Sequence, residues 1–230
     1  MKKYLILFIL PFLLGCSKGQ NKTPGENTAS IIADQSYKDD LIRVAKRLYD
    51  RELTSGTGGD ISVRVPGTDR IIIKATKTCF GDLDYGKLST LNLEGEVVEG
   101  NPSPSDEAEI HVRVYSLRED VGAIMHMHSP YATAWATVGG KIPAVTQQSV
   151  KPLTAVALVP YYRVGSPELV GAVVESYRNP GTTVVMMENH GTFVVGADLY
   201  DVLYQAEVVE NTARIAYLCK ALGEPVKFEF

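Results

Sequence analysis

Four histidines occur in the chain, and two of them, His126 and His128, are separated by one residue in an otherwise apolar segment. Alternate residues of a β-strand project from the same face, so a strand here directs both imidazoles to one side. The segment ends at Ser129-Pro130, where a strand would stop and a cleft could form. Imidazole nitrogens are common ligands of Zn²⁺, and catalytic zinc sites often combine three protein ligands with an open position. The pair therefore predicts a metal site that requires a third ligand.

Two other residues are candidates for the same site. His190 precedes Gly191 at the end of another predicted strand, and Glu107 begins a predicted helix after the Pro-Ser stretch at 102–105. A histidine is more often a packed or surface residue than a ligand, but three of the four lie at strand ends, which favours the metal. His111 lies four residues after Glu107 on the same helical face, so we expect it to orient that carboxylate or to pack in the core.

Hydrophobic spacing predicts alternating helices and strands that would position these side chains. Helical spacing covers residues 37–53, 106–117, 131–138, 167–177 and 199–222. Strands are expected at 61–65, 71–73, 88–93, 96–98, 121–128, 155–159, 182–187 and 193–195, the first four as two hairpins, and a Gly-rich loop at 54–59. No internal repeat or second linker divides residues 36–230, so the pattern predicts one α/β domain.

The composition is that of an ordinary globular domain, with 45% apolar and 22% charged residues in 230. The formal net charge of −4 gives no basic field that would recruit nucleic acid. Cys79 and Cys219 show no disulfide framework, and whether they pair is left open.

The N-terminus has the pattern of a bacterial lipoprotein signal peptide over residues 1–15. Two lysines precede an apolar run that is too short to span a bilayer, and the run ends at Leu-Leu-Gly before Cys16, the expected lipidation site. The polar stretch at 16–35 is expected to be a flexible tether. These features predict a lipid anchor that faces the periplasm or the cell surface, with a cytoplasmic location as the alternative if the signal is not used.

Together, the string around His126 and His128, the Pro-Ser-Asp-Glu motif at 104–107 and the Asn-His-Gly motif at 189–191 resemble the class II aldolase/adducin family. The resemblance covers residues 38–222. It implies a three-layer α/β/α fold with a central, mainly antiparallel sheet, a homotetramer, and one Zn²⁺ or other divalent metal per subunit. It also implies that His126, His128 and His190 bind the metal, and that Glu107 ligates the empty metal and acts as acid and base on substrate.

The same resemblance predicts where substrate would bind, at Gly58, Gly59, Asp60, Thr76, Lys77, Ser105 and Asp106. Two departures bear on phosphate recognition. The Gly-rich loop of sugar-phosphate aldolases ends in Gly-Asn, whereas Asp60 follows here, and the second phosphate-binding stretch lacks its Ser-Gly pair. Lys74 or Lys77 could attract an anion, or both could be solvated surface. Gln147 stands where many relatives have a tyrosine, which leaves the proton donor to the leaving carbonyl unidentified.

The residues and the resemblance together favour a metal-dependent lyase that cleaves a ketose or hydroxy keto acid, unphosphorylated in our hypothesis, by a retro-aldol step. The same metal site could instead serve 4-epimerisation, dehydration or decarboxylation, although epimerase relatives carry Asp at the position of Glu107. A non-catalytic, adducin-like binding domain is the remaining alternative, and the presence of all three histidines argues against it.

Overall fold

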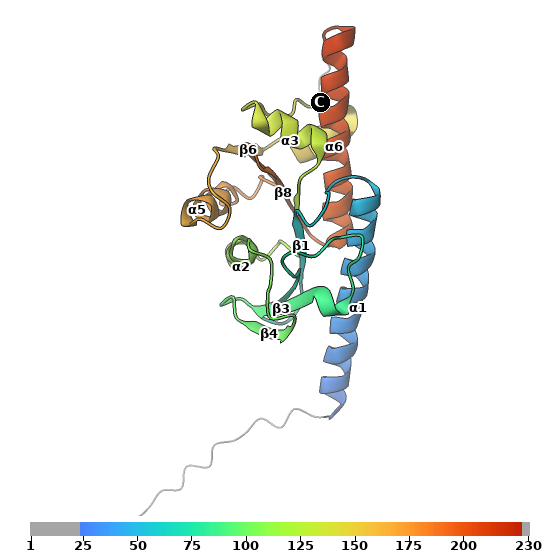
Figure 1. Ribbon diagram of the computed structural model, residues 1–230, viewed down its shortest axis with the longest axis vertical. Helices are drawn as coiled ribbons and strands as arrows, with labels where there is room; N and C mark the ends of the chain where they lie inside the picture. The colour runs from blue at the N-terminus through green and yellow to red at the C-terminus, as the bar shows by residue number, and fades with distance from the viewer. Residues whose placement is uncertain (1–23, 227–230) are drawn as a thin grey trace, which may run out of the picture.

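An eight-stranded sheet runs through the middle of the structure, with helices on both of its faces (Figure 1). The computed structural model describes residues 24–226, and the side chains from residue 34 onward. The strands are β1 (Asp60–Arg64), β2 (Arg70–Lys74), β3 (Leu88–Asn92), β4 (Val97–Gly100), β5 (Ala123–Met127), β6 (Val156–Val159), β7 (Val184–Met187) and β8 (Gly191–Gly196). Their order is β4-β3-β2-β1-β5-β8-β7-β6, and all neighbours are antiparallel except β6 and β7.

The helices form the two outer layers. They are α1 (Pro24–Asp50), α2 (Ala108–Leu117), α3 (Pro130–Thr137), α4 (Val150–Leu153), α5 (Pro167–Ser176) and α6 (Leu199–Leu222), with short 3₁₀ turns η1 (Tyr85–Lys87) and η2 (Gln147–Ser149). In Figure 1, α1 and α6 lie along one side of the sheet and α2 and α5 along the other. The crossover through α5 makes the β6–β7 pair parallel. The structure confirms the expected three-layer α/β fold with a mainly antiparallel sheet.

Strand alternation divides the core into two halves. In β2, Ile72 belongs to the half under α1 and α6, whereas Ile71 and Ile73 belong to the half under α2 and α5. In β5, Met125 faces the first half and Ile124 the second. His126 has the same parity as Ile124, so its imidazole points into the layer of α2 and α5.

The first helix begins earlier than the sequence predicts. We expected a helix from residue 37 after a flexible tether at 16–35, but α1 starts at Pro24, so residues 24–35 are helical and the tether prediction is corrected there. Proline suits the first turn of a helix, and Ala29 and Ala33 are strong helix formers. Their propensity lets the helix extend beyond the turns that Leu41 and Leu48 anchor in the core.

The other predicted elements occur with bounds shifted by a few residues. Both hairpins form, as β1–β2 and β3–β4. The segment at 147–153, for which no element was predicted, folds as η2 and α4. The predicted signal peptide and Cys16 lie outside the described residues. Within the described part of the chain, Cys79 and Cys219 carry free thiols, and no helix is long and apolar enough to cross a bilayer.

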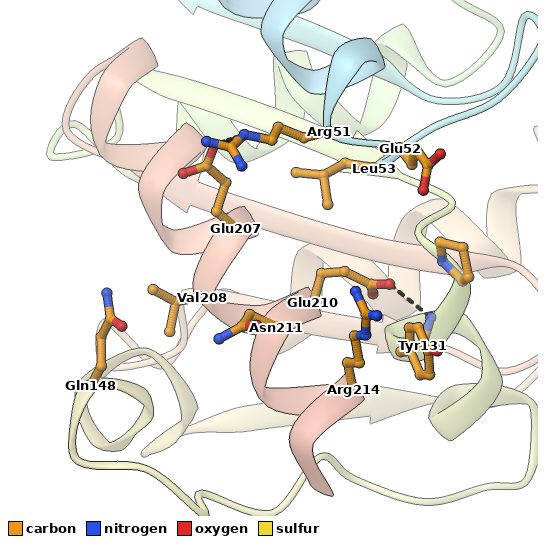
Figure 2. A pocket seen from close by; sticks show the side chains of 11 residues that line it. Arg51, Glu52, Leu53, Tyr131, Gln148, Glu207, Val208, Glu210, Asn211 and Arg214 are labelled. Atoms are coloured by element: carbon orange, nitrogen blue, oxygen red, sulfur yellow. Dashed lines mark hydrogen bonds and ion pairs between the residues drawn. The ribbon is translucent and has the colours of Figure 1, made fainter. Parts of the chain in front are cut away.

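A carboxylate from α6 holds the start of α3, directly after the histidine strand. Glu210 accepts hydrogen bonds from the backbone N–H groups of Tyr131 at 2.9 Å and Ala132 at 2.8 Å. Figure 2 shows the Glu210 side chain directed toward Tyr131. Both residues line a cavity of about 360 Å³. The Ser129 side chain makes no capping bond, so Glu210 supplies the anion that the helix N-terminus favours.

Replacing this carboxylate should destabilise the fold measurably. Glu210→Ala leaves two N–H groups of α3 without their acceptor, so the free energy of unfolding should fall by about 1–2 kcal/mol in urea titrations. Glu94→Ala, at an exposed turn, is the matched control and should change it by less than about 0.5 kcal/mol. Equal stability of the two variants would contradict a capping role for Glu210.

Candidate metal centre

The two histidines of β5 reach one point at the end of the strand. His126 is fully buried and its ring stacks on Phe193 of β8 with centroids 4.4 Å apart. Its Nδ1 lies 3.2 Å from the carbonyl oxygen of Thr192, an acceptor that holds a proton on Nδ1 and directs Nε2 into the site. The Nε2 atom of His128, one residue beyond the strand, lies 2.8 Å from the Nε2 atom of His126.

His190 joins the pair from the turn between β7 and β8. Its backbone N–H bonds to the carbonyl of Met187 at 3.3 Å, which closes the turn, and Asn189 takes a left-handed conformation with φ of 55°. The three imidazoles provide ligand nitrogens within 4.8 Å of one another. The strand-end spacing noted in the sequence therefore does bring His126, His128 and His190 together.

Glu107 enters the same space from the start of α2. It occupies the N-cap position, but its side chain makes no capping bond to the helix. Its Oε2 instead lies 3.1 Å from Nε2 of His126 and 3.7 Å from Nε2 of His190. The sequence predicts that Glu107 lies inside the first helical turn. It lies instead at the N-cap, one residue before the helix, so its carboxylate can face the histidines.

These groups change one another's proton affinity. Burial disfavours a charged His126, but the adjacent Glu107 carboxylate outweighs burial and raises the His126 pKa to about 9. Burial and the neighbouring imidazoles lower the pKa of His128 to about 4, and burial lowers the pKa of His190. For Glu107, burial acts upward, but His126 outweighs it and the carboxyl pKa lies below its usual value. The Glu107 carboxylate is thus ionised beside a protonated His126, while burial favours the neutral forms of His128 and His190.

The residues fit a bound divalent cation. Two imidazole nitrogens 2.8 Å apart can share one proton at most, and a cation between the rings would satisfy all three histidines at once. Oε1 of Glu107 and Nδ1 of His190 are buried and lack a hydrogen-bond partner among the described residues. Three neutral imidazoles with one carboxylate form a donor set that suits zinc and similar metals.

Glycines allow the chain to pass close to these rings. A Cβ atom on Gly191 would lie 2.4 Å from the carbonyl oxygen of Met127 and 2.8 Å from Cδ2 of His128. A Cβ atom on Gly59, whose φ is +72°, would lie 2.5 Å from the carbonyl oxygen of His126. The predicted Gly-rich loop therefore lies against the histidines, with Gly58 beside the ring of His128.

A chain of buried polar side chains lies beneath the site. Asp60 is 1% exposed, and its Oδ1 accepts from Nε2 of His111 at 2.7 Å while Ser105 Oγ donates to its Oδ2. His111 Nδ1 lies 2.7 Å from Ser62 Oγ, which lies 2.8 Å from the hydroxyl of Tyr115. Burial opposes ionisation of Asp60, but the charge and hydrogen bond of His111, with smaller contributions from His126 and Ser105, hold the Asp60 pKa below the ordinary range. His111 therefore bonds to Asp60. The backbone N–H of Glu107 donates instead to Ser105 Oγ, at 3.2 Å.

Lys74 is a buried cation that joins two loops. Its Nζ lies 2.8 Å from the carbonyl oxygen of Thr78, 3.3 Å from that of Ala75 and 3.5 Å from that of Thr57 in the Gly-rich loop. Burial lowers its pKa. Of the two readings left open for Lys74, anion attraction and solvated surface, the second is wrong, because the side chain is 1% exposed.

The remaining predicted substrate residues, Thr76, Lys77 and Asp106, make fewer contacts. Thr76 donates its backbone N–H to the carbonyl of Ser103 at 3.1 Å, which places its loop beside the Pro-Ser stretch. Lys77 is exposed with a left-handed φ of 57°, and Asp106 is exposed. Sequence reasoning missed Ser62 and Tyr115. Their signals were present, because Tyr115 is four residues after His111 on one helical face and Ser62 alternates with Ile61 and Val63.

Comparison with known proteins identifies the family. Residues 39–217 match the family described as the class II aldolase and adducin N-terminal domain. The chain belongs to the class II aldolase and adducin family. This membership confirms the resemblance stated from the motifs around His126, Glu107 and His190, and it accounts for the shared fold.

Relatives within the family are enzymes. The chain is 31% identical over 191 residues to the 5-deoxy-D-ribulose 1-phosphate aldolase of Bacillus thuringiensis serovar kurstaki, covering 83% of this chain and 89% of the relative. It is 29% identical over 207 residues to the 3-oxo-tetronate 4-phosphate decarboxylase of Haemophilus influenzae, covering 86% and 93%. A solved L-fuculose 1-phosphate aldolase superposes with a TM-score of 0.76 at 31% identity, covering 84% and 91%.

Loss of one imidazole should abolish metal binding. His126→Ala leaves two histidines and a carboxylate, so zinc retained after gel filtration should fall from near one per chain to less than about a tenth. His111→Gln changes a buried histidine outside the triad and should keep near one zinc per chain, by elemental analysis. Retention of zinc by His126→Ala would contradict the assigned ligand set.

Proposed function

We propose that the chain is a zinc-dependent class II aldolase-type lyase, which cleaves a carbon–carbon bond in a ketose or a hydroxy keto acid by a retro-aldol step. The observation that carries this proposal is the Glu107 carboxylate, 3.1 Å from Nε2 of His126 and 3.7 Å from Nε2 of His190. A base placed at the metal ligands can act on a carbon adjacent to a carbonyl held at the same point. A purely structural carboxylate would instead cap its helix, which Glu107 does not do.

His126, His128 and His190 would hold the metal through their Nε2 atoms. When bound, the cation would polarise the substrate carbonyl and stabilise the negative charge that develops as the carbon–carbon bond breaks. The Thr192 carbonyl would keep the remaining proton of a metal-bound His126 on Nδ1, so that Nε2 faces the site. The metal identity and the homotetramer stay predictions.

Glu107 would move the proton at the reacting carbon. Its carboxylate is ionised, because the adjacent imidazole of His126 lowers its pKa despite burial, so it can accept the proton that the substrate hydroxyl loses as its carbon becomes the new carbonyl, and can deliver a proton to the other product carbon. The Ser105 hydroxyl fixes the turn that carries it, through the Glu107 N–H. Gln147, which stands where many relatives carry a tyrosine, is exposed in η2. An amide cannot donate a proton to the leaving carbonyl as an acid.

Decarboxylation is the second candidate, because a relative of 29% identity over most of both chains carries that name. Both reactions break a bond to the carbon beside a polarised carbonyl, so the same residues would serve either. Release of CO₂ from a 3-keto acid, with no aldehyde product, would favour decarboxylation over the aldolase proposal. The epimerase, dehydratase and adducin-like alternatives have no such specific observation in their favour.

Removing the charge of Glu107 should separate catalysis from metal binding. Glu107→Gln keeps the three imidazoles, so zinc should remain near one per chain while kcat falls about 10²–10⁴-fold. Glu109→Gln, two residues away on the exposed face of α2, is the control and should leave kcat unchanged. Unchanged turnover in Glu107→Gln would reject the proton-transfer role.

We further propose that the substrate is unphosphorylated, although the relatives named above act on phosphates by their names. Asp60 follows the Gly-rich loop, and its buried carboxylate would repel a phosphate group. The Lys74 ammonium already donates to carbonyl oxygens of its own loops. We expect kcat/KM on free ketoses or hydroxy keto acids to exceed that on L-fuculose 1-phosphate by at least about tenfold. Equal or higher kcat/KM on the phosphate, in a coupled aldehyde assay, would overturn this choice of substrate.

A further inference from the structure

Helix α1 connects the metal centre to the N-terminal part of the chain. It ends at Asp50, and the Gly-rich loop that follows it places Gly59 against His126. The C-terminal end of α1 therefore lies near the metal centre, and its N-terminal end at Pro24 lies far from it. With 27 residues at 1.5 Å each, the helix is about 40 Å long. Figure 1 shows the blue end of α1 projecting beyond the sheet, on the side away from α3.

Ion pairs fasten the N-terminal half of α1 to the edge of the sheet. Arg70 of β2 pairs with Asp34 of α1 at 2.7 Å and with Glu99 of β4 at 2.9 Å. Glu99 also pairs with Lys38 of α1 at 2.5 Å, and these four residues form the Arg70 cluster. Asp34 is 7% exposed, so solvent screens this cluster less than ordinary surface pairs. Arg70 begins β2 and Lys74 ends it beside the Gly-rich loop, so the cluster lies at the end of the strand that is farther from the metal centre.

More than half of α1 is an addition to the family domain. The family match begins at residue 39, so 15 of the 27 residues of α1 precede it. Asp34 and Lys38, the two members of the Arg70 cluster on α1, both belong to this added part. The added turns continue the helix that Leu41 anchors in the core. The ion pairs therefore hold the addition in line with the rest of the helix.

The predicted lipid anchor is too close to α1 for the metal centre to face a membrane. Eight Cα steps separate Cys16 from Pro24, and they span at most about 29 Å even when fully extended. If the domain were inverted onto the bilayer, the chain would have to run back along the whole of α1, about 40 Å. The chain is too short for that, which excludes the inverted orientation for a lipid-anchored chain.

Charge opposes a domain that lies flat on the lipid. The formal net charge of −4 becomes −6 when a signal peptide that holds Lys2 and Lys3 is removed. An anionic lipid surface repels such a domain within about 10 Å, the screening length at moderate salt. An upright domain keeps most of its surface outside that range.

We propose that α1, held by the Arg70 cluster, is a stalk that keeps the domain upright on a lipid surface. The metal centre then lies about 40 Å from the bilayer and is open to the aqueous phase. Its substrate is accordingly a water-soluble compound and not a lipid headgroup. The inference rests on the anchor predicted at Cys16 and goes beyond the proposed reaction, which it does not require.

Energy transfer from two sites on α1 to the bilayer measures this orientation. The full-length lipidated chain, with Cys79→Ser and Cys219→Ser, carries one donor dye at Ser36→Cys or at Asp50→Cys, both exposed. Vesicles of phosphatidylethanolamine and phosphatidylglycerol carry an acceptor dye on a headgroup. The two sites are about 21 Å apart along the helix, so we expect at least about threefold more transfer from Ser36→Cys. Equal transfer from the two sites, or more from Asp50→Cys, would overturn the upright stalk.

Two further variants test the part played by the ion pairs. Arg70→Gln releases the added turns from the sheet edge, so the transfer ratio should fall below about twofold. Glu99→Gln, at a half-exposed site, should act in the same direction and serves if Arg70→Gln does not fold by circular dichroism. Lys46→Gln removes an exposed charge of α1 outside the cluster and should keep the ratio. A ratio that both cluster variants keep would overturn their role in the stalk.

Vesicle flotation separates this inference from the proposed function. If the full-length chain does not float with the vesicles, the anchor and the stalk fail together, while the metal-dependent lyase still stands on zinc content and kcat. If the chain floats with the expected transfer ratio but binds no zinc, the stalk stands and the proposed function fails.

Discussion

The position of β5 between β1 and β8 is the constraint on which the centre depends. Both neighbours run antiparallel to β5, so the register places Asp60 opposite His126 on one side and Phe193 opposite His126 on the other. A slip of one residue in either ladder would turn a polar side chain to the other half of the core. The fully buried apolar residues of β5 on both faces, Met125 and Ile124 among them, hold that register.

The same arrangement carries a cost in stability. Three imidazoles and two carboxylates lie close together, and Oε1 of Glu107 and Nδ1 of His190 have no protein partner among the described residues. Buried polar groups of this kind are expensive unless something satisfies them. The apolar halves of the core under α1 and α6, and under α2 and α5, offset that cost.

The parts of the fold that were predicted correctly are those with strong local sequence signals. The hairpins and the histidine strand were predicted because alternation and turn residues are local properties, as with Ile61, Val63 and Val65 before the Pro66-Gly67 turn. The start of α1 was missed because polar composition was taken to indicate a tether, whereas Pro24 and the alanines permit a helix. The segment at 147–153 has no periodicity, and its fold depends on packing against α6.

The sequence predicted which side chains meet at the site but not what supports them. Residue type and spacing made His126, His128, His190 and Glu107 candidates, and the structure brings them together. The partner of His111 could not be deduced, because Glu107 lies on the same helical face while Asp60 is distant in sequence and adjacent only through the β1–β5 ladder. Burial of Lys74 was likewise hidden, because lysine is seldom buried and its carbonyl partners have no sequence signature.

The start of α2 shows how helix chemistry and site chemistry are combined. An N-terminal turn has free N–H groups and a positive dipole end, which favours nearby anions. Glu107 at the N-cap leaves this capping unused, and Ser105 takes over part of it by accepting the Glu107 N–H while donating to Asp60. Both carboxylates therefore lie at the positive end of one helix, on opposite sides of the same serine. The start of α2 therefore favours the ionised forms of both carboxylates beside the histidines.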